Sequence, residues 1–290
     1  MMQIAISVIL AMIGFFGCFF LSPYICRIST RELQKEREEY EQEYVKWQGF
    51  VEKAKDRLSR PDAQEEKFSV WERIVAFFTR VNLTPTLEEL NEYEWDFLQE
   101  PVKKPVYSTK RKVLIGLVGA FLFGAAGYEY GFSMQLVIIL ALYLLLIFIT
   151  FVDIDAQIIP PIFNLLIFLL GIPAIWLFPE VTLPQRIIGI ISISVPLLLI
   201  VMVVPGGFGG GDIKLMAAAG FFLGVKANIA AFAIGLLCGG TYGVIALATK
   251  KRGRKEHFAF GPCLCIGIAI AVYAGWGIRM VDLYLHYLIH

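Results

Sequence analysis

The sequence predicts an all-α membrane protein, a polytopic bundle of about eight transmembrane helices with a helical cytoplasmic insertion. Hydrophobic residues make up 57% of the chain, and its mean hydropathy is +0.66. The charged residues gather mostly in one N-terminal block instead of being spread along the chain. Apolar runs of roughly 18 residues, long enough to cross a bilayer as helices, follow one another through the remainder.

The apolar runs define the expected spans. In chain order they are residues 4–24, 113–130, 134–152, 162–178, 187–204, 213–224, 229–248 and 258–277. We interpret the first as a retained span because it lacks the basic start and small-residue cleavage site of a signal peptide. The sixth is short, since about twelve residues cover only roughly 18 Å as a helix. We expect a short crossing there, because a re-entrant loop would move the basic residues 250–255 to the outer side.

Basic residues set the predicted topology. Arg27 and Arg31 follow the first span, Lys110–Lys112 precede the second, and residues 250–255 form a third basic segment. The positive-inside rule places these segments in the cytoplasm and both termini outside. The division is then residues 1–24 as a first transmembrane helix, 25–112 as a cytoplasmic helical domain and 113–290 as a transmembrane catalytic domain. A formal net charge of +1 argues against nucleic-acid binding.

Helical patterns recur in the cytoplasmic block. Apolar residues spaced three and four apart predict a long amphipathic helix over residues 33–58, with Ser29 and Glu32 as a capping box unless the helix simply continues the first span. Residues 70–81 suit a helix lying on the membrane surface, and residues 84–100 a further helix. We interpret the block as a solvated helical insertion, with recognition of substrate or of pilus assembly proteins as the alternative.

Metal ligands are not evident. The five cysteines are scattered, mostly within apolar spans, so we expect them to pack in the core instead of forming disulfides or a zinc site. His286 and His290 have helical i, i+4 spacing, but a frayed amphipathic tail explains them better than a metal site.

Three acidic residues lie at predicted cytoplasmic ends of spans. Asp153 and Asp155 close the third span, and Asp212 follows the glycine-rich residues 206–211 after the fifth. Carboxylates at membrane depth are costly and are functional candidates by default, although each could also snorkel to water. Glycines at 209 and 211 would let the backbone approach an extended substrate closely. Lys214 and the helix start beside it would favour an anionic Asp212.

These segments resemble those of the type IV prepilin and preflagellin peptidases. Residues 209–215 (GGGDIKL) match the GxGD motif of these membrane aspartyl proteases, and residues 153–160 (DIDAQIIP) are similar to their other aspartate motif. Residues 260–262 resemble the family's FGP segment, and the likeness covers roughly residues 113–280. The resemblance implies Asp153 and Asp212 as the catalytic pair, with Asp155 as the competitor to Asp153.

The resemblance also implies the reaction. Two neighbouring carboxylates share a proton, so one activates water and the other protonates the scissile group, with no cofactor or metal. The expected substrate is a prepilin or prepilin-like protein, cut at the cytoplasmic boundary of the bacterial inner or plasma membrane. Expected partners are the lipid bilayer and type IV pilus or type II secretion assembly proteins. The paired CxxC motifs of many relatives are missing, and N-methylation with S-adenosylmethionine stays open.

Other classes compete with this interpretation. A transporter or channel could use glycine-broken helices and buried aspartates. A non-catalytic scaffold of pilus assembly would depend on the cytoplasmic block instead, and a preflagellin-type or presenilin-like peptidase would cut a different substrate. The dependence of proteolysis, transport or assembly on Asp212 separates them.

Overall fold

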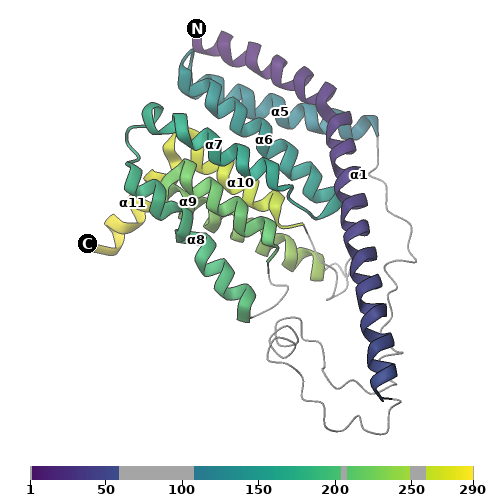
Figure 1. Ribbon diagram of the computed structural model, residues 1–290. Helices are drawn as coiled ribbons and strands as arrows, with labels where there is room; N and C mark the ends of the chain where they lie inside the picture. The colour runs from purple at the N-terminus through teal and green to yellow at the C-terminus, as the bar shows by residue number, and fades with distance from the viewer. Residues whose placement is uncertain (1, 59–107, 204–207, 249–258, 290) are drawn as a thin grey trace. The chain divides into compact units, whose positions relative to one another are not determined.

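Every regular element in the described part of the chain is helical. The computed structural model describes residues 2–58, 108–203, 208–248 and 259–289 (Figure 1). The elements are α1 (Met2–Leu58), α5 (Thr109–Tyr130), α6 (Met134–Ala156), α7 (Pro161–Leu177), α8 (Leu183–Val203), α9 (Gly210–Ala248), α10 (Gly261–Val272), the 3₁₀ helix η1 (Tyr273–Gly275) and α11 (Trp276–Ile289). The predicted all-α class is confirmed.

The chain divides into two compact units, residues 1–32 with 105–290 and residues 33–104. In the second unit the described part is the continuation of α1 to Leu58. The first predicted span and the predicted amphipathic helix are therefore one uninterrupted helix. The surface helix predicted at residues 70–81 and the helix predicted at 84–100 lie outside the described residues.

Several helices can cross a membrane. Within the described residues five are long and apolar enough, and α10 with α11, bent by 80°, makes a sixth if the pair counts as one span. The helix α7 is apolar but shorter. The prediction of several spans is confirmed, while the last predicted span, residues 258–277, is not one straight helix. It breaks at η1, where Gly275 has a φ of +62°.

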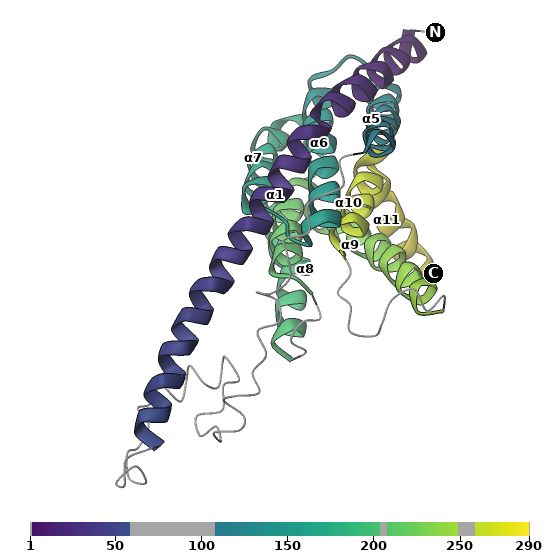
Figure 2. The ribbon, with the colours of Figure 1, turned by 90° about the vertical axis from the view of Figure 1, so that its right-hand side faces the viewer.

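The start of α1 packs against α5 through small residues (Figures 1 and 2). The Ser7 hydroxyl donates to the Gly124 carbonyl oxygen at 2.7 Å. A Cβ placed on Gly14 would lie 2.4 Å from the Gly119 carbonyl oxygen, so the two backbones touch directly. Residue numbers rise on one helix as they fall on the other, which makes the pair antiparallel.

The long helix α9 reverses direction at Gly224. This residue has a φ of 77° and a ψ of 175°, which a helix cannot contain. The Asn228 side-chain amide donates to the Met216 carbonyl oxygen at 3.3 Å, whereas twelve residues of straight helix would separate them by roughly 18 Å. The two halves, residues 210–223 and 225–248, correspond to the sixth and seventh predicted spans.

A buried arginine fastens the turn to its neighbours. Arg186 in the first turn of α8 is fully buried. Its guanidinium donates to carbonyl oxygens at the end of α7, Ala174 at 2.8 Å and Phe178 at 3.2 Å. It also donates to Phe222 and, at 3.3 Å, to Phe221, just before the reversal in α9. Helix C-termini present carbonyls without intrahelical partners, so one cation satisfies two helix ends at once.

Candidate active site

Asp153 lies in the last turn of α6 and is 4% exposed. Its Oδ2 accepts a hydrogen bond of 2.9 Å from the N–H of Gly261, the first residue of α10. A helix C-terminus disfavours a carboxylate, but the start of α10 contributes positive potential from the other side. Gln157 then ends α6 in the left-handed conformation and turns the chain toward Ile159.

Asp212 lies in the first turn of α9 and is 7% exposed. Its Oδ2 accepts a hydrogen bond of 3.1 Å from the N–H of Gly209, the residue before the helix. In return, the Asp212 N–H donates to the Gly209 carbonyl oxygen at 3.1 Å. This side-chain bond is the returning half of a capping box, and the helix N-terminus adds electrostatic support.

The two aspartates come together at one end of the bundle, from α6 and α9. Ile159 is buried between the segments that hold them. A Cβ on Gly211 would lie 3.0 Å from the Ile159 Cβ, and one on Gly261 would lie 3.2 Å from its Cδ1. Three chain segments therefore converge around the pair.

Asp155 belongs to a different set of contacts. Its Oδ2 forms an ion pair with Arg111 of α5 and accepts a hydrogen bond of 3.0 Å from the Ser29 hydroxyl of α1. Arg111 also donates to the Phe151 carbonyl oxygen at 3.4 Å. The Asp155 side chain is 7% exposed, so this pair ties α5 and α1 to the end of α6.

The remaining predicted site residues differ in their surroundings. Gly209 and Gly211 both precede Asp212: Gly209 lies directly before α9, and Gly211 is in the first turn of this helix. Lys214 is exposed and lies two residues beyond Asp212 in α9. It adds a positive charge near the start of this helix.

Several residues beside the aspartates were not assigned roles from the sequence. Gly261 supplies the donor to Asp153, and the FGP segment was the signal that could have identified it. The rings of Phe208 and Phe260, each directly before a donor glycine, have centroids 5.3 Å apart at 66°. Cys265 of α10 lies four residues beyond Gly261 and is buried.

Asn164 is a further polar residue that sequence reasoning passed over. It lies in α7, is 6% exposed, and its side-chain amide has no hydrogen-bond partner among the described residues. An unsatisfied buried amide costs roughly 1–3 kcal/mol. Its polar character within an otherwise apolar run was the available signal.

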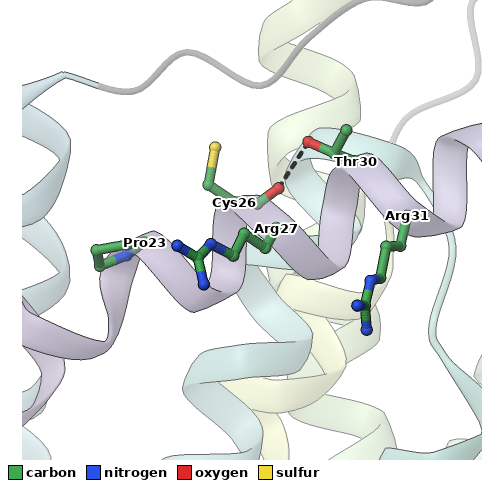
Figure 3. A pocket seen from close by; sticks show the side chains of 5 residues that line it. All are labelled: Pro23, Cys26, Arg27, Thr30 and Arg31. Carbon is green, nitrogen blue, oxygen red and sulfur yellow. Dashed lines mark hydrogen bonds between the residues drawn. The ribbon is translucent and has the colours of Figure 1, made fainter.

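A hollow of about 470 Å³ lies beside α1 where the apolar span meets basic residues; its lining residues are Pro23, Cys26, Arg27, Thr30 and Arg31. Figure 3 shows Arg31 pointing away from Cys26 and Thr30, with the Thr30 hydroxyl donating to the Cys26 carbonyl oxygen at 2.8 Å. The Arg27 guanidinium lies 5.6 Å from the Tyr24 ring centroid. The charge of this hollow is positive.

Residues 140–244, which include both buried aspartates, match the type IV leader peptidase family. A prepilin leader peptidase/N-methyltransferase of Bacillus subtilis is 35% identical over 55% of this chain and 64% of its own length. Proteins of the same name from Neisseria gonorrhoeae and Legionella pneumophila are 32% and 29% identical, over 54% and 56% of this chain. The resemblance predicted from the aspartate motifs is confirmed.

The likeness covers only part of those relatives. The chain spans 64%, 55% and 58% of their lengths. No solved structure matches this chain.

Proposed function

We propose that this chain, whose residues 140–244 match the type IV leader peptidase family, is a membrane aspartic endopeptidase that cleaves the leader peptide of prepilins or prepilin-like proteins. One observation carries the proposal. Asp153 and Asp212, from separate membrane helices, are both buried, and each accepts a main-chain hydrogen bond from a glycine at a helix start. The phenylalanine rings that directly precede these two glycines are in contact with each other.

The arrangement suits acid–base catalysis by a carboxyl pair. Two neighbouring carboxylates cannot both ionise cheaply, so they would hold one proton between them. The ionised partner takes a proton from the attacking water, while the protonated partner donates its proton to the oxygen of the scissile carbonyl. When the intermediate collapses, the aspartate that took the water proton gives it to the leaving amine, and its partner recovers a proton from a hydroxyl of the intermediate. Each glycine N–H bonds to one carboxyl oxygen and so restrains the rotation of that carboxyl group.

The substrate follows from the bilayer and the family. A prepilin has a basic leader in the cytoplasm and an apolar helix in the membrane, so its cleavage site lies at the cytoplasmic boundary. The basic residues Arg27, Arg31 and Lys110–Lys112 support a cytoplasmic position for the same end of the bundle, because Arg111 pairs with Asp155, two residues from Asp153. The protein would then be a multi-pass protein of the bacterial cytoplasmic membrane.

The proposed division of labour follows the predicted domains. Residues 113–290 carry the catalytic pair, residues 1–24 anchor the chain, and residues 25–112 contact substrate or assembly proteins of type IV pili or type II secretion. The contact of Ser29 with Asp155 supports a mechanical link between the end of the first span and the catalytic helix α6.

N-methylation is not part of the proposal. The relatives carry N-methyltransferase in their names, but no contact of the described residues identifies a site for S-adenosylmethionine, so no step is assigned to it.

The test uses the full chain reconstituted in vesicles with a prepilin substrate, and leader removal is followed as a mobility shift on a gel. Asp153→Asn and Asp212→Asn should each reduce cleavage by about 10³-fold or more, because each removes half of the acid–base pair. Asp155→Asn is the matched control, with the same chemical change two residues away, and should retain cleavage. Full cleavage by the Asp212→Asn protein contradicts the mechanism, and Asp212-dependent ion or solute uptake without proteolysis would indicate a transporter.

A further inference from the structure

The two aspartates are held by the same short sequence used twice. Phe208-Gly209 precedes α9 and Phe260-Gly261 begins α10. In both places the glycine N–H donates to an aspartate Oδ2, at 3.1 Å for Asp212 and 2.9 Å for Asp153. The positions of the two aspartate side chains therefore depend on two Phe-Gly dipeptides that lie far apart in the sequence.

The two phenylalanine rings meet. Their centroids are 5.3 Å apart and their planes make an angle of 66°, an edge-to-face contact. Both side chains are half-buried and pack against the hydrophobic core. The contact joins the N-terminal ends of α9 and α10 directly, next to the donors on which the aspartates depend.

Each phenylalanine ring is connected to the carboxyl group of its aspartate by a short and stiff path. One peptide unit connects Phe208 to the Gly209 N–H, and Phe260 to the Gly261 N–H. The Phe260 carbonyl oxygen also accepts the first hydrogen bonds of α10, from Cys263 at 3.0 Å and Leu264 at 3.2 Å, so its backbone is fixed to the helix. A shift of either ring must therefore move a donor, and with it the carboxyl group that accepts from it.

We propose that Phe208 and Phe260 form an aromatic clamp that sets the separation of the Asp153 and Asp212 carboxyl groups. The inference rests on the proposed peptidase function and names two positioning residues for it. A pair of carboxyls that shares a proton and holds one water works only over a narrow range of separations. A misplacement of about 1 Å in a catalytic group lowers turnover by roughly 10²-fold.

A second aromatic pair provides a matched control. Phe168 of α7 and Phe221 of α9 stack with centroids 4.4 Å apart. Phe221 lies nine residues beyond Asp212 on the same helix, roughly 13 Å along its axis. Losing this ring contact should weaken the bundle without changing the separation of the carboxyls.

The first experiment measures kcat and KM for prepilin cleavage by the reconstituted full chain. Phe208→Leu and Phe260→Leu should each lower kcat about 10- to 100-fold with KM within about twofold, because substrate still binds but the pair is misplaced. The double variant should be no slower than the slower single variant, since either change opens the same contact. Phe208→Tyr keeps the ring and should restore most of the kcat. Phe168→Leu should lower the unfolding temperature and leave kcat unchanged.

The second experiment does not depend on activity. Hydrogen exchange of the segment containing Gly261 should accelerate in Phe208→Leu, and that of the segment containing Gly209 in Phe260→Leu, because each ring holds the opposite loop. Phe168→Leu should leave both segments as in the wild type.

Three results would overturn the clamp. These are multiplicative kcat losses in the double variant, a loss of kcat in Phe168→Leu as large as in the clamp variants, or exchange changes confined to the mutated loop. If the wild-type chain cleaves prepilin and Asp212→Asn does not, such results reject the clamp alone. If the wild-type chain fails to cleave, the peptidase proposal fails, and the exchange measurement still decides whether the two loops are coupled.

Discussion

Replacing Gly261 with alanine should slow the proposed cleavage through steric displacement of Asp153. A Cβ at this position would lie 2.7 Å from the Asp153 Oδ2 and 3.2 Å from the Ile159 Cδ1, whereas ordinary contact begins at 3.4 Å. The carboxyl oxygen must therefore retreat by about 0.7 Å (3.4 minus 2.7), with Ile159 buried behind it. That retreat weakens the 2.9 Å bond from the Gly261 N–H.

The size of the effect follows from the bond and the packing. A hydrogen bond to a charged group contributes roughly 1.5–3 kcal/mol, and each 1.4 kcal/mol is a factor of ten in rate when it acts on the transition state. We expect kcat for prepilin cleavage to fall about 10- to 100-fold in Gly261→Ala. Overpacking should also lower the free energy of unfolding by about 1–3 kcal/mol.

The control is another glycine of the same site. Gly210 lies two residues before Asp212, and a Cβ there would meet nothing within 4 Å. Gly210→Ala should therefore keep kcat within about threefold of the wild type, with a small gain in helix propensity. The reasoning is refuted if Gly261→Ala cleaves at the wild-type rate, or if Gly210→Ala is impaired as strongly as Gly261→Ala.

Three further predictions concern the frame around the site. Arg111→Gln should lower the free energy of unfolding by about 3–5 kcal/mol, more than Asp155→Asn, because it leaves a buried carboxylate unpaired; thermal unfolding in detergent measures both, and equal effects would argue against the ion pair. Arg186→Met should cost about 2–4 kcal/mol by leaving several helix-end carbonyls unsatisfied, and Arg186→Lys should recover only part of this, since one ammonium cannot reach them all; full recovery would contradict the two-helix role. Gly189→Ala should prevent stable folding, because its Cβ would lie 2.2 Å from the Gly220 carbonyl oxygen; normal yield and melting of this variant would show that α8 and α9 can separate.

The fold was largely predictable because membrane-spanning helices can be identified from the length and the apolar composition of their segments. The reversal at Gly224 was anticipated as two spans, since residues 213–224 and 229–248 read as separate apolar runs. The break within the predicted span 258–277 was not anticipated, because composition alone does not register the turn at Gly275. The predicted span 187–204 leaves out Arg186, yet this residue is buried among carbonyls, an outcome that depends on where two other helices end.

Motifs identified the candidate aspartates, whereas their contacts depend on the fold. Asp153 and Asp212 were chosen from motifs, and in the structure the segments that hold them meet around Ile159 and through the Phe208 and Phe260 rings. The preference for Asp153 over Asp155 rested on alignment, whereas the physical distinction is the ion pair with Arg111, a residue some forty positions earlier. This ion pair requires the packing of α5 on α6, which cannot be predicted from the sequence around Asp155.

The use of main-chain donors at both aspartates shapes how this protein would respond to random mutation. The donors at Gly209 and Gly261 are backbone N–H groups. Truncating a side chain therefore cannot remove the hydrogen bond that either carboxylate accepts. The loss of activity caused by a substitution at either glycine should therefore increase with the volume of the new side chain. It should depend very little on the polarity of that side chain. Proline would be the exception, because it removes the donor as well as adding volume.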